Sequence, residues 1–170
     1  MYFASHPKIE YDGHEAVNIF RSSRLLKKLN TNRFLLKEYI IQDGETPELV
    51  AFNLYDNAKY HWSIIIINSI VNLNTQWPLS SDNLFKYVEE KYEDPDGFHH
   101  YEDEDGTVID APPGVFGQLL SDMTVTNLEY ETKINENKSK IKVLHSSHLN
   151  SFVTEFKETI KGSRLIKRLS

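Results

Sequence analysis

The feature that most restricts the fold is a series of local signals in residues 39–62, YIIQDGETPELVAFNLYDNAKYHW. The β-branched residues at its start favour a short strand, and in the turn that follows Gly44 can take a positive φ without steric cost. Thr46 suits the N-cap of a helix, and Pro47 suits the first helical position, where its missing N–H costs nothing. The segment therefore predicts a strand, a tight turn and a capped helix.

The apolar run that follows predicts a second helix over about residues 58–70, capped by the YDN before it. The isoleucines at 64–67 have strand propensity instead. Because the apolar stretch extends back to Tyr60, it is more typical of a helix that is buried on most sides.

A loop and a third helix come next. We expect a short edge strand near Trp77, because Pro78 cannot donate to a strand ladder. Ser81 or Asp82 can cap the third helix. Its apolar side carries Leu84, Phe85 and Val88.

Residues 93–113 have the composition of an acidic β-hairpin with EDG at its turn. His99 and His100 are adjacent, so in a strand they should point to opposite sides. The apolar residues of the hairpin arms are Tyr101, Val108 and Ile109.

The acidic turn resembles a calcium loop only in part. With Gly106 at position six, Asp103 and Asp105 fall at ligand positions. Tyr101 then stands at position one and Pro112 at position twelve, and neither supplies a carboxylate. We interpret the segment as an exposed acidic turn.

The C-terminal segment predicts a helix in NLEYETKINENKSK, a strand or helical turn in IKVL, and a long helix over residues 146–162. Ser146 or Ser147 can cap this last helix, and Gly162 suits a left-handed stop. Burial of its apolar stripe, at about 1.5–3 kcal/mol per side chain, exceeds its intrinsic propensity. The stripe therefore needs a partner surface, in this chain or in another protein. Its members are Leu149, Phe152, Val153, Phe156 and Ile160.

The charges are segregated along the chain, whose formal net charge is -6. Residues 21–37 are basic, residues 89–110 are mostly acidic, and the last residues are basic again. We expect residues 1–38 to form an extended arm with a short helix, docking through separate apolar anchors. The basic segments are short and carry no nucleic-acid motif, so we expect no nucleic-acid partner. The anchors are Phe20, Leu25, Leu26, Leu29 and Phe34.

Several classes of chemistry are not expected. The chain has no cysteine, no signal-peptide pattern at its start and no apolar run long enough for a bilayer. His145 and His148 can share a helical face, but no third ligand stands at metal-site spacing. The carboxylates of residues 89–94 cluster among other acids, unlike a glycosidase pair, and no nucleophile elbow or phosphate loop occurs. We therefore predict no catalytic residue, metal or cofactor.

Two segments resemble the small baseplate wedge protein of contractile-tailed, T4-type bacteriophages. The first, EYIIQDGETPELVAFNLYDNAKYHWSIIIINSIVN, is similar to the family's strand, P-E-x-[LVA]-A-x-x-[IL]-Y helix and tryptophan-containing apolar run, and Trp77 matches a further tryptophan. The second, YETKINENKSKIKVLHSSHLNSFVTEF, is similar to the family's C-terminal region. The matching residues of the first are Tyr39, Ile41, Pro47, Glu48, Leu49, Ala51, Leu54, Tyr55, Tyr60, Trp62 and Asn68. Those of the second are Tyr130, Glu131, Asn135, Glu136, Ile141, Lys142, Val143, Leu149, Asn150, Ser151 and Phe152.

The resemblance implies an α+β fold with a LysM-like strand–helix–helix–strand core, an extended N-terminal arm, an acidic β-hairpin insertion and C-terminal helices. We accordingly expect an arm (1–38), a LysM-like module (39–92), a hairpin and loop (93–124) and a helical segment (125–170).

The resemblance also implies a structural protein of the virion, assembled in the host cytoplasm, that joins neighbouring baseplate wedges without catalysis. Its partners would be other wedge proteins and hub- or sheath-proximal tail proteins, with six copies per baseplate and no membrane. We expect the contacts to involve Phe20, Leu25, Leu26, Tyr101, Leu149, Phe152, Val153, Phe156 and Ile160.

Two other functions are kept as alternatives. The first is a LysM-type module that binds peptidoglycan or another glycan, in which Trp62, Trp77, Tyr55 or Tyr60 would stack on sugar rings. Such stacking requires an exposed ring beside polar donors. The second is a wall-degrading enzyme, which the missing carboxylate pair disfavours.

Overall fold

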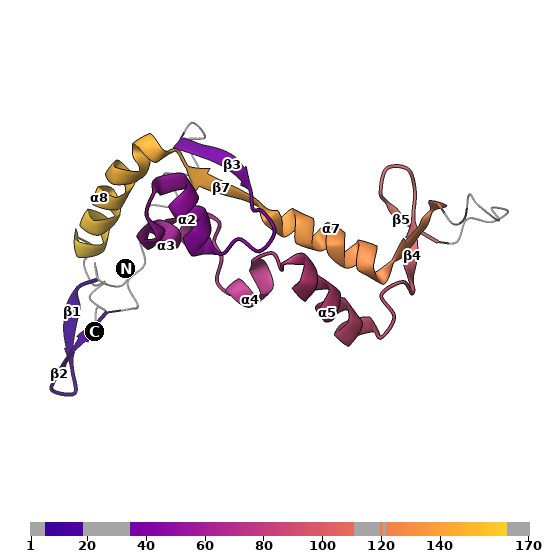
Figure 1. The fold of residues 1–170 in the computed structure, drawn as a ribbon. Helices are drawn as coiled ribbons and strands as arrows, with labels where there is room; N and C mark the ends of the chain where they lie inside the picture. The colour runs from indigo at the N-terminus through magenta and orange to yellow at the C-terminus, as the bar shows by residue number, and fades with distance from the viewer. Residues whose placement is uncertain (1–5, 19–34, 111–119, 121, 163–170) are drawn as a thin grey trace. The chain divides into compact units, whose positions relative to one another are not determined.

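A computed structural model describes residues 6–18, 35–110, 120 and 122–162 (Figure 1). The chain divides into two compact units. Unit 1 comprises the described parts of Met1–Ile40, Glu45–Leu73 and Ile141–Ser170, and unit 2 those of Ile41–Gly44 and Asn74–Lys140. No helix in the described ranges has the length and apolarity needed to cross a membrane.

The N-terminal region contains a hairpin that the sequence analysis did not predict. Strands β1 (Lys8–Tyr11) and β2 (His14–Val17) pair antiparallel. Asp12 and Gly13 between them both have positive φ, 50° and 73°, the geometry of a two-residue hairpin turn. The anchors Phe20, Leu25 and Leu26 lie outside the described residues.

A two-stranded sheet of β3 (Leu36–Ile40) and β7 (Lys140–Leu144) belongs to unit 1. The amide of His145 donates to the carbonyl of Leu35 over 3.0 Å, which sets the start of β3 beside the end of β7. The strands are therefore antiparallel, with Leu36 opposite Leu144 and Glu38 opposite Lys142. IKVL, for which a strand or a helical turn was expected, forms a strand.

The helices between these strands follow the predicted signals. Helix α2 (Pro47–Tyr55) starts at Thr46, whose side chain accepts a hydrogen bond from the Leu49 amide over 3.3 Å. After a turn at Asp56, in left-handed conformation, come the short η3 (Ala58–Tyr60) and then α3 (His61–Ile67). The isoleucine run is thus helical, as predicted, and it ends earlier than expected, because Asn68 caps α3.

The core of unit 1 lies between α3, β7 and the C-terminal helix α8 (Ser146–Gly162). The ring of Trp62 packs on those of Phe152 and Phe156, with centroids 5.8 and 4.6 Å apart. The predicted helix over residues 146–162 is confirmed, and Gly162 is also the last described residue. The buried residues of this core are Trp62, Leu144, Leu149, Phe152, Phe156 and Ile160.

Unit 2 is built on two helices, α5 (Ser81–Tyr92) and α7 (Asn127–Ser139), which follow the short α4 (Leu73–Gln76). Thr126 caps α7 in a complete capping box with Glu129. The N-cap of α5 is Ser80, one residue before the expected Ser81 or Asp82. The edge strand expected near Trp77 is wrong: this residue lies in a bend and is buried, and β7 supplies the second strand instead. Pro78, which follows Trp77, has no N–H to donate to a strand ladder, whereas apolar and polar residues alternate in IKVL as they do in a half-buried strand.

A three-stranded sheet with the order β5-β4-β6 completes unit 2. Its strands are β4 (Phe98–Glu102), β5 (Val108–Ile109) and β6 (Thr124–Thr126), so the predicted acidic hairpin is formed by β4 and β5. The pairing of β4 with β6 shifts register between Phe98 and His100, which marks a β-bulge. The described chain thus mixes helices and strands as an α+β fold does. The division at residues 38, 92 and 124 stays a prediction.

Candidate functional site

The apolar stripe of α8 is covered within this chain. Leu149, Phe152 and Phe156 are at most 5% exposed and Ile160 is fully buried, all in the core of unit 1. Val153 is partly buried beside them. The sequence analysis allowed a surface in this chain or in another protein to cover the stripe, and in the structure the covering surface belongs to this chain. A role of the stripe in contacts with other proteins stays a prediction.

Tyr101 lies on β4, partly buried, with its ring 4.8 Å from that of Phe98. Phe98 itself is 57% exposed. This ring pair is in unit 2, whereas the stripe of α8 is in unit 1.

His99 and His100 lie on the same side of β4, which corrects the expectation that they point apart. Their Nδ1 atoms are 2.7 Å apart, and both rings contact Tyr130 of α7. The β-bulge at this point is the physical reason, because an extra residue interrupts the alternation of side chains along a strand. The ring of His99 stacks on that of Tyr130, with centroids 3.9 Å apart.

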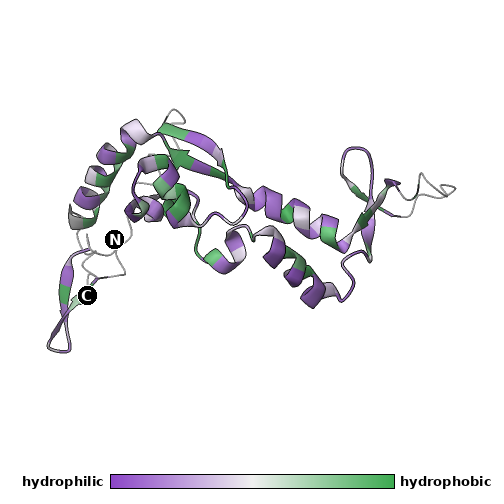
Figure 2. Cartoon of the chain, viewed as in Figure 1, coloured by the Kyte–Doolittle hydropathy of each residue, from purple (hydrophilic) through white to green (hydrophobic). Residues whose placement is uncertain are grey.

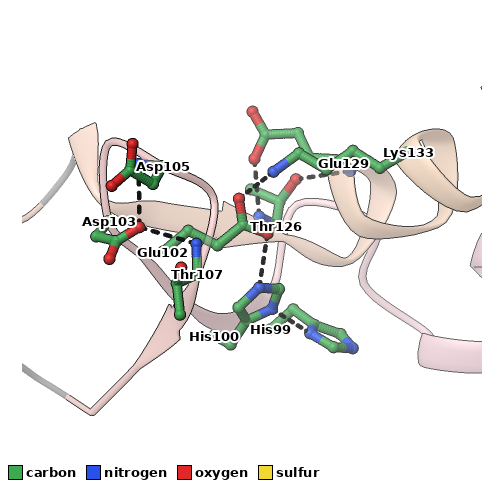
Figure 3. A network of polar contacts seen from close by, with 9 residues as sticks. All are labelled: His99, His100, Glu102, Asp103, Asp105, Thr107, Thr126, Glu129 and Lys133. Carbon is green, nitrogen blue, oxygen red and sulfur yellow. Dashed lines mark hydrogen bonds and ion pairs between the residues drawn. The ribbon is translucent and has the colours of Figure 1, made fainter.

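Glu102 connects this histidine pair to α7 (Figure 3). One of its carboxylate oxygens accepts from His100 Nε2 over 2.9 Å, and the other accepts from Lys133 Nζ. A carboxylate can only accept, so His100 carries its proton on Nε2. When both rings are neutral, His100 Nδ1 therefore has no proton, and His99 Nδ1 is the donor of the hydrogen bond between the two rings. The hydrogen bonds from Lys133 and His100 lower the pKa of Glu102. Burial, followed by the proximity of His100, lowers the pKa of His99.

Another carboxylate, the buried Glu131, ties α5 to α7. It accepts from Lys91 Nζ over 2.6 Å and from the Tyr92 hydroxyl over 2.8 Å. Burial alone would raise the pKa of Glu131, but these hydrogen bonds outweigh it and the pKa is lowered. A carboxylate that is fully engaged in this way holds two helices together and is not a poised general acid or base.

The acidic turn uses its own carboxylate to shape its backbone. Asp103 accepts from the amides of Asp105 and Thr107 over 3.0 and 2.8 Å (Figure 3). Within the described ranges, no three His, Cys, Asp or Glu residues are grouped so that they could hold a metal ion. His145 and His148 lie with ring centroids 6.4 Å apart.

The tryptophans that a glycan site would need are buried. Trp62 and Trp77 are only 7% and 8% exposed. Tyr55 is partly buried, and its hydroxyl donates to the Leu144 carbonyl over 3.2 Å. Burial raises its pKa to about 12. These rings act as core, and their positions give no support to the glycan-binding alternative.

The exposed apolar residues of α2 form a candidate interaction surface, which we call the α2 surface. Most residues of helix α2 are apolar, and its ribbon accordingly contains green segments in Figure 2. Val50 and Ala51 are fully buried in unit 1, whereas Leu49 and Phe52, one turn apart, are 45% and 53% exposed. Sequence periodicity could not separate the two faces, because both are apolar. Neither of these residues was among the predicted contacts.

The comparison with protein families assigns the chain. A family model described as Base plate wedge protein 53 matches residues 1–111. The match includes more than half of the chain, so the protein belongs to this family of phage baseplate wedge proteins and is a structural component of the tail baseplate. Association with other baseplate proteins follows from this membership. The comparison with curated proteins gives no match.

Proposed function

We propose that this chain joins neighbouring wedges during baseplate assembly, in six copies per baseplate. Its direct partners would be larger wedge proteins and tail proteins near the hub or the sheath, and assembly would take place in the host cytoplasm. The observation that carries the proposal is the family match over residues 1–111. A ring of repeated contacts can be stable even where each contact is weak, since binding at one site raises the effective concentration at the next.

The α2 surface is the place where we expect one of these contacts. Two large apolar side chains that are exposed one turn apart on a helix can serve as anchors for a partner. Glu48 directly precedes Leu49 and stands one turn before Phe52 on the same helix, and its Oε1 lies 3.9 Å from His61 Nε2, so charged groups lie next to this apolar pair. This arrangement, apolar in the centre and polar at the rim, is common in protein interfaces.

We further propose that β3, α2, α3 and β7 form a LysM-like module, whose second strand is then Lys140–Leu144 and lies outside the expected residues 39–92. Their order along the chain is strand, helix, helix, strand, and the two strands pair with each other. In this proposal most of unit 2 is an insertion between α3 and β7, so the module is discontinuous in sequence. Its role is packing, which fits the burial of Trp62.

A complementation experiment tests the joining role. Wedges assembled from a phage that lacks this chain should remain separate, and addition of the purified chain should close them into six-fold rings visible by electron microscopy. The variant with Leu49→Asp and Phe52→Asp should close at least tenfold fewer rings. The control with Leu49→Met and Phe52→Leu keeps the surface apolar and should act like the wild type. Rings that close without the chain would contradict the proposal. If both variants close as many rings as the wild type, the α2 surface is not one of the contacts.

A further inference from the structure

The two edges of the β3–β7 sheet differ. The outward edge of β7 is covered by side chains of unit 1. Asn68 Nδ2 donates to the Lys142 carbonyl over 2.7 Å, and Asn68 Oδ1 accepts from the Lys142 amide over 2.8 Å. The Tyr55 hydroxyl donates to the next outward carbonyl, that of Leu144. No further strand can pair with β7 there.

Within the described residues, two positions on the outward edge of β3, Leu36 and Glu38, have no such cover. In the antiparallel register, Leu36 and Glu38 lie opposite Leu144 and Lys142, whose backbone groups face away from the ladder. The amides and carbonyls of Leu36 and Glu38 must therefore also point away from β7. Among the described residues, none donates or accepts a hydrogen bond to these backbone groups.

The edge of β3 can accept a strand of complementary charge. Proteins protect an exposed edge with short strands, charged side chains, a proline, a bulge or a covering element. Of these devices β3 has its short length and the charges of Lys37 and Glu38, which select against strands of like charge. β3 contains no proline, has regular extended backbone over its length and ends in Ile40, which is 60% exposed. A sheet of only two strands gains stability from a third. The chemistry that satisfies a row of amides and carbonyls is another extended backbone.

Charge decides against a second copy of this chain as that strand. If the β3 strands of two copies of this chain pair antiparallel, two registers let the outward backbone groups of both Leu36 and Glu38 form hydrogen bonds within the strands. One register places Glu38 opposite Glu38, and the other places Lys37 opposite Lys37. Like charges directly opposite each other destabilise a sheet. A strand from a different protein, with a basic residue opposite Glu38 and an apolar one opposite Leu36, meets no such cost.

We propose that the outward edge of β3 binds an extended segment of another baseplate wedge protein by β-strand addition. The segment becomes the third strand of the sheet, with backbone hydrogen bonds to Leu36 and Glu38. This inference rests on the proposed function, since it assumes that the chain enters a wedge.

A pair of substitutions at one position tests the backbone contact. Glu38→Pro removes the outward N–H, and it leaves the bonds to β7 intact because that N–H does not face β7. Glu38→Val removes the charge and keeps the N–H. Each variant is co-expressed with the remaining wedge proteins of the same phage, and its amount in purified wedges is measured. We expect Glu38→Val to enter wedges like the wild type and Glu38→Pro to enter at least tenfold less, although both free variants melt at similar temperatures.

Hydrogen exchange of the wild-type chain gives a second readout, which also decides the matter if Glu38→Pro fails to fold. The amides of Leu36 and Glu38 should exchange rapidly in the free chain and at least about 100-fold more slowly in purified wedges. If the chain enters wedges but these amides exchange at the same rate, or if Glu38→Pro enters as well as Glu38→Val, the inference is overturned while the proposed function stands. A wild-type chain that does not enter wedges overturns both.

Discussion

The side-chain amide of Asn68 bonds to both backbone groups of Lys142, through one donated and one accepted hydrogen bond of 2.7 and 2.8 Å. It acts there as the backbone of a neighbouring strand would. The same Nδ2 also donates to the Ile64 carbonyl over 2.9 Å, near the end of α3. One residue thus ends a helix, occupies a sheet edge and brings together two segments that are far apart in the sequence.

Substitution of Asn68 should destabilise unit 1. Asn68→Ala removes three hydrogen bonds and leaves backbone groups of α3 and β7 without these partners, at a cost of about 1–3 kcal/mol. Asn68→Asp keeps the acceptor for the Lys142 amide but places a carboxylate against two carbonyls, so it should cost at least as much. Urea unfolding followed by tryptophan fluorescence measures both. A change below about 0.3 kcal/mol in Asn68→Ala would show that water replaces these bonds without cost.

Phe156→Ala should cost the free chain about 3–5 kcal/mol, because this ring is 1% exposed and its removal leaves a cavity beside Trp62. Phe85→Ala is the control, since Phe85 on α5 is 44% exposed and its loss should cost little. Denaturant unfolding of the two free variants gives the difference. If the α8 stripe is kept for contacts with other proteins and is not core, Phe156→Ala will leave the stability of the free chain unchanged.

Unit 1 should tolerate removal of most of unit 2. The shortened chain lacks residues 70–138. Because Asn68 contacts Lys142, the two ends of this segment lie close together, and a linker of about six Gly and Ser residues can join residue 69 to residue 139. We expect the shortened chain to keep the far-ultraviolet circular dichroism of α2, α3 and α8 and to unfold cooperatively. A chain without a cooperative transition would show that unit 1 depends on unit 2, and would weaken the proposal of a discontinuous LysM-like module.

Acid should destabilise unit 2 in two stages. The pKa of His99 lies below its ordinary value of 6.5 because of burial and the nearby His100. The unfolded chain therefore takes up this proton first, and stability falls as the pH drops through 6.5 toward the folded pKa. Glu102 and Glu131 have pKa values below the ordinary 4.5, so their contribution is lost only as the pH falls below that value.

The control for the first stage is His99→Phe, which keeps a ring against Tyr130 and removes the titrating group. Its melting temperature should be constant between pH 7 and 5, whereas that of the wild type should fall. The charged groups around the pair, Glu102, Glu131, Lys91 and Lys133, remain in the variant. An equal decline in both proteins would assign the acid sensitivity to other groups.

The elements with strong local signals were predictable. Thr46 and Pro47 fixed the start of α2, and the apolar spacing of residues 149–160 predicted α8. These signals act within one or two turns of the chain and need no tertiary context. The hairpin β1–β2 was missed although its signal, Asp12 before Gly13, is as local as these.

The remaining features depend on contacts that are distant in sequence. The sequence predicts an edge strand near Trp77, whereas the strand that pairs with β3 is β7, much later in the chain. No local pattern in the sequence determines which distant strand pairs with β3. The bulge that turns His99 and His100 to one side arises from the pairing of β4 with β6. The exposed face of α2 could not be recognised because Leu49 and Phe52 are strongly apolar, as the buried Val50 is.

The order of the strands also has a consequence for synthesis. The ribosome makes β3, α2 and α3 early, but β7 and α8 emerge only after all of unit 2. Unit 2 therefore has the opportunity to fold while the first half of unit 1 is still waiting for its sheet partner and for the helix that covers Trp62. A nascent chain that stalls after α7 has emerged, and before β7 and α8 are made, would carry a complete unit 2 and a first half of unit 1 whose Trp62 is not yet covered by α8.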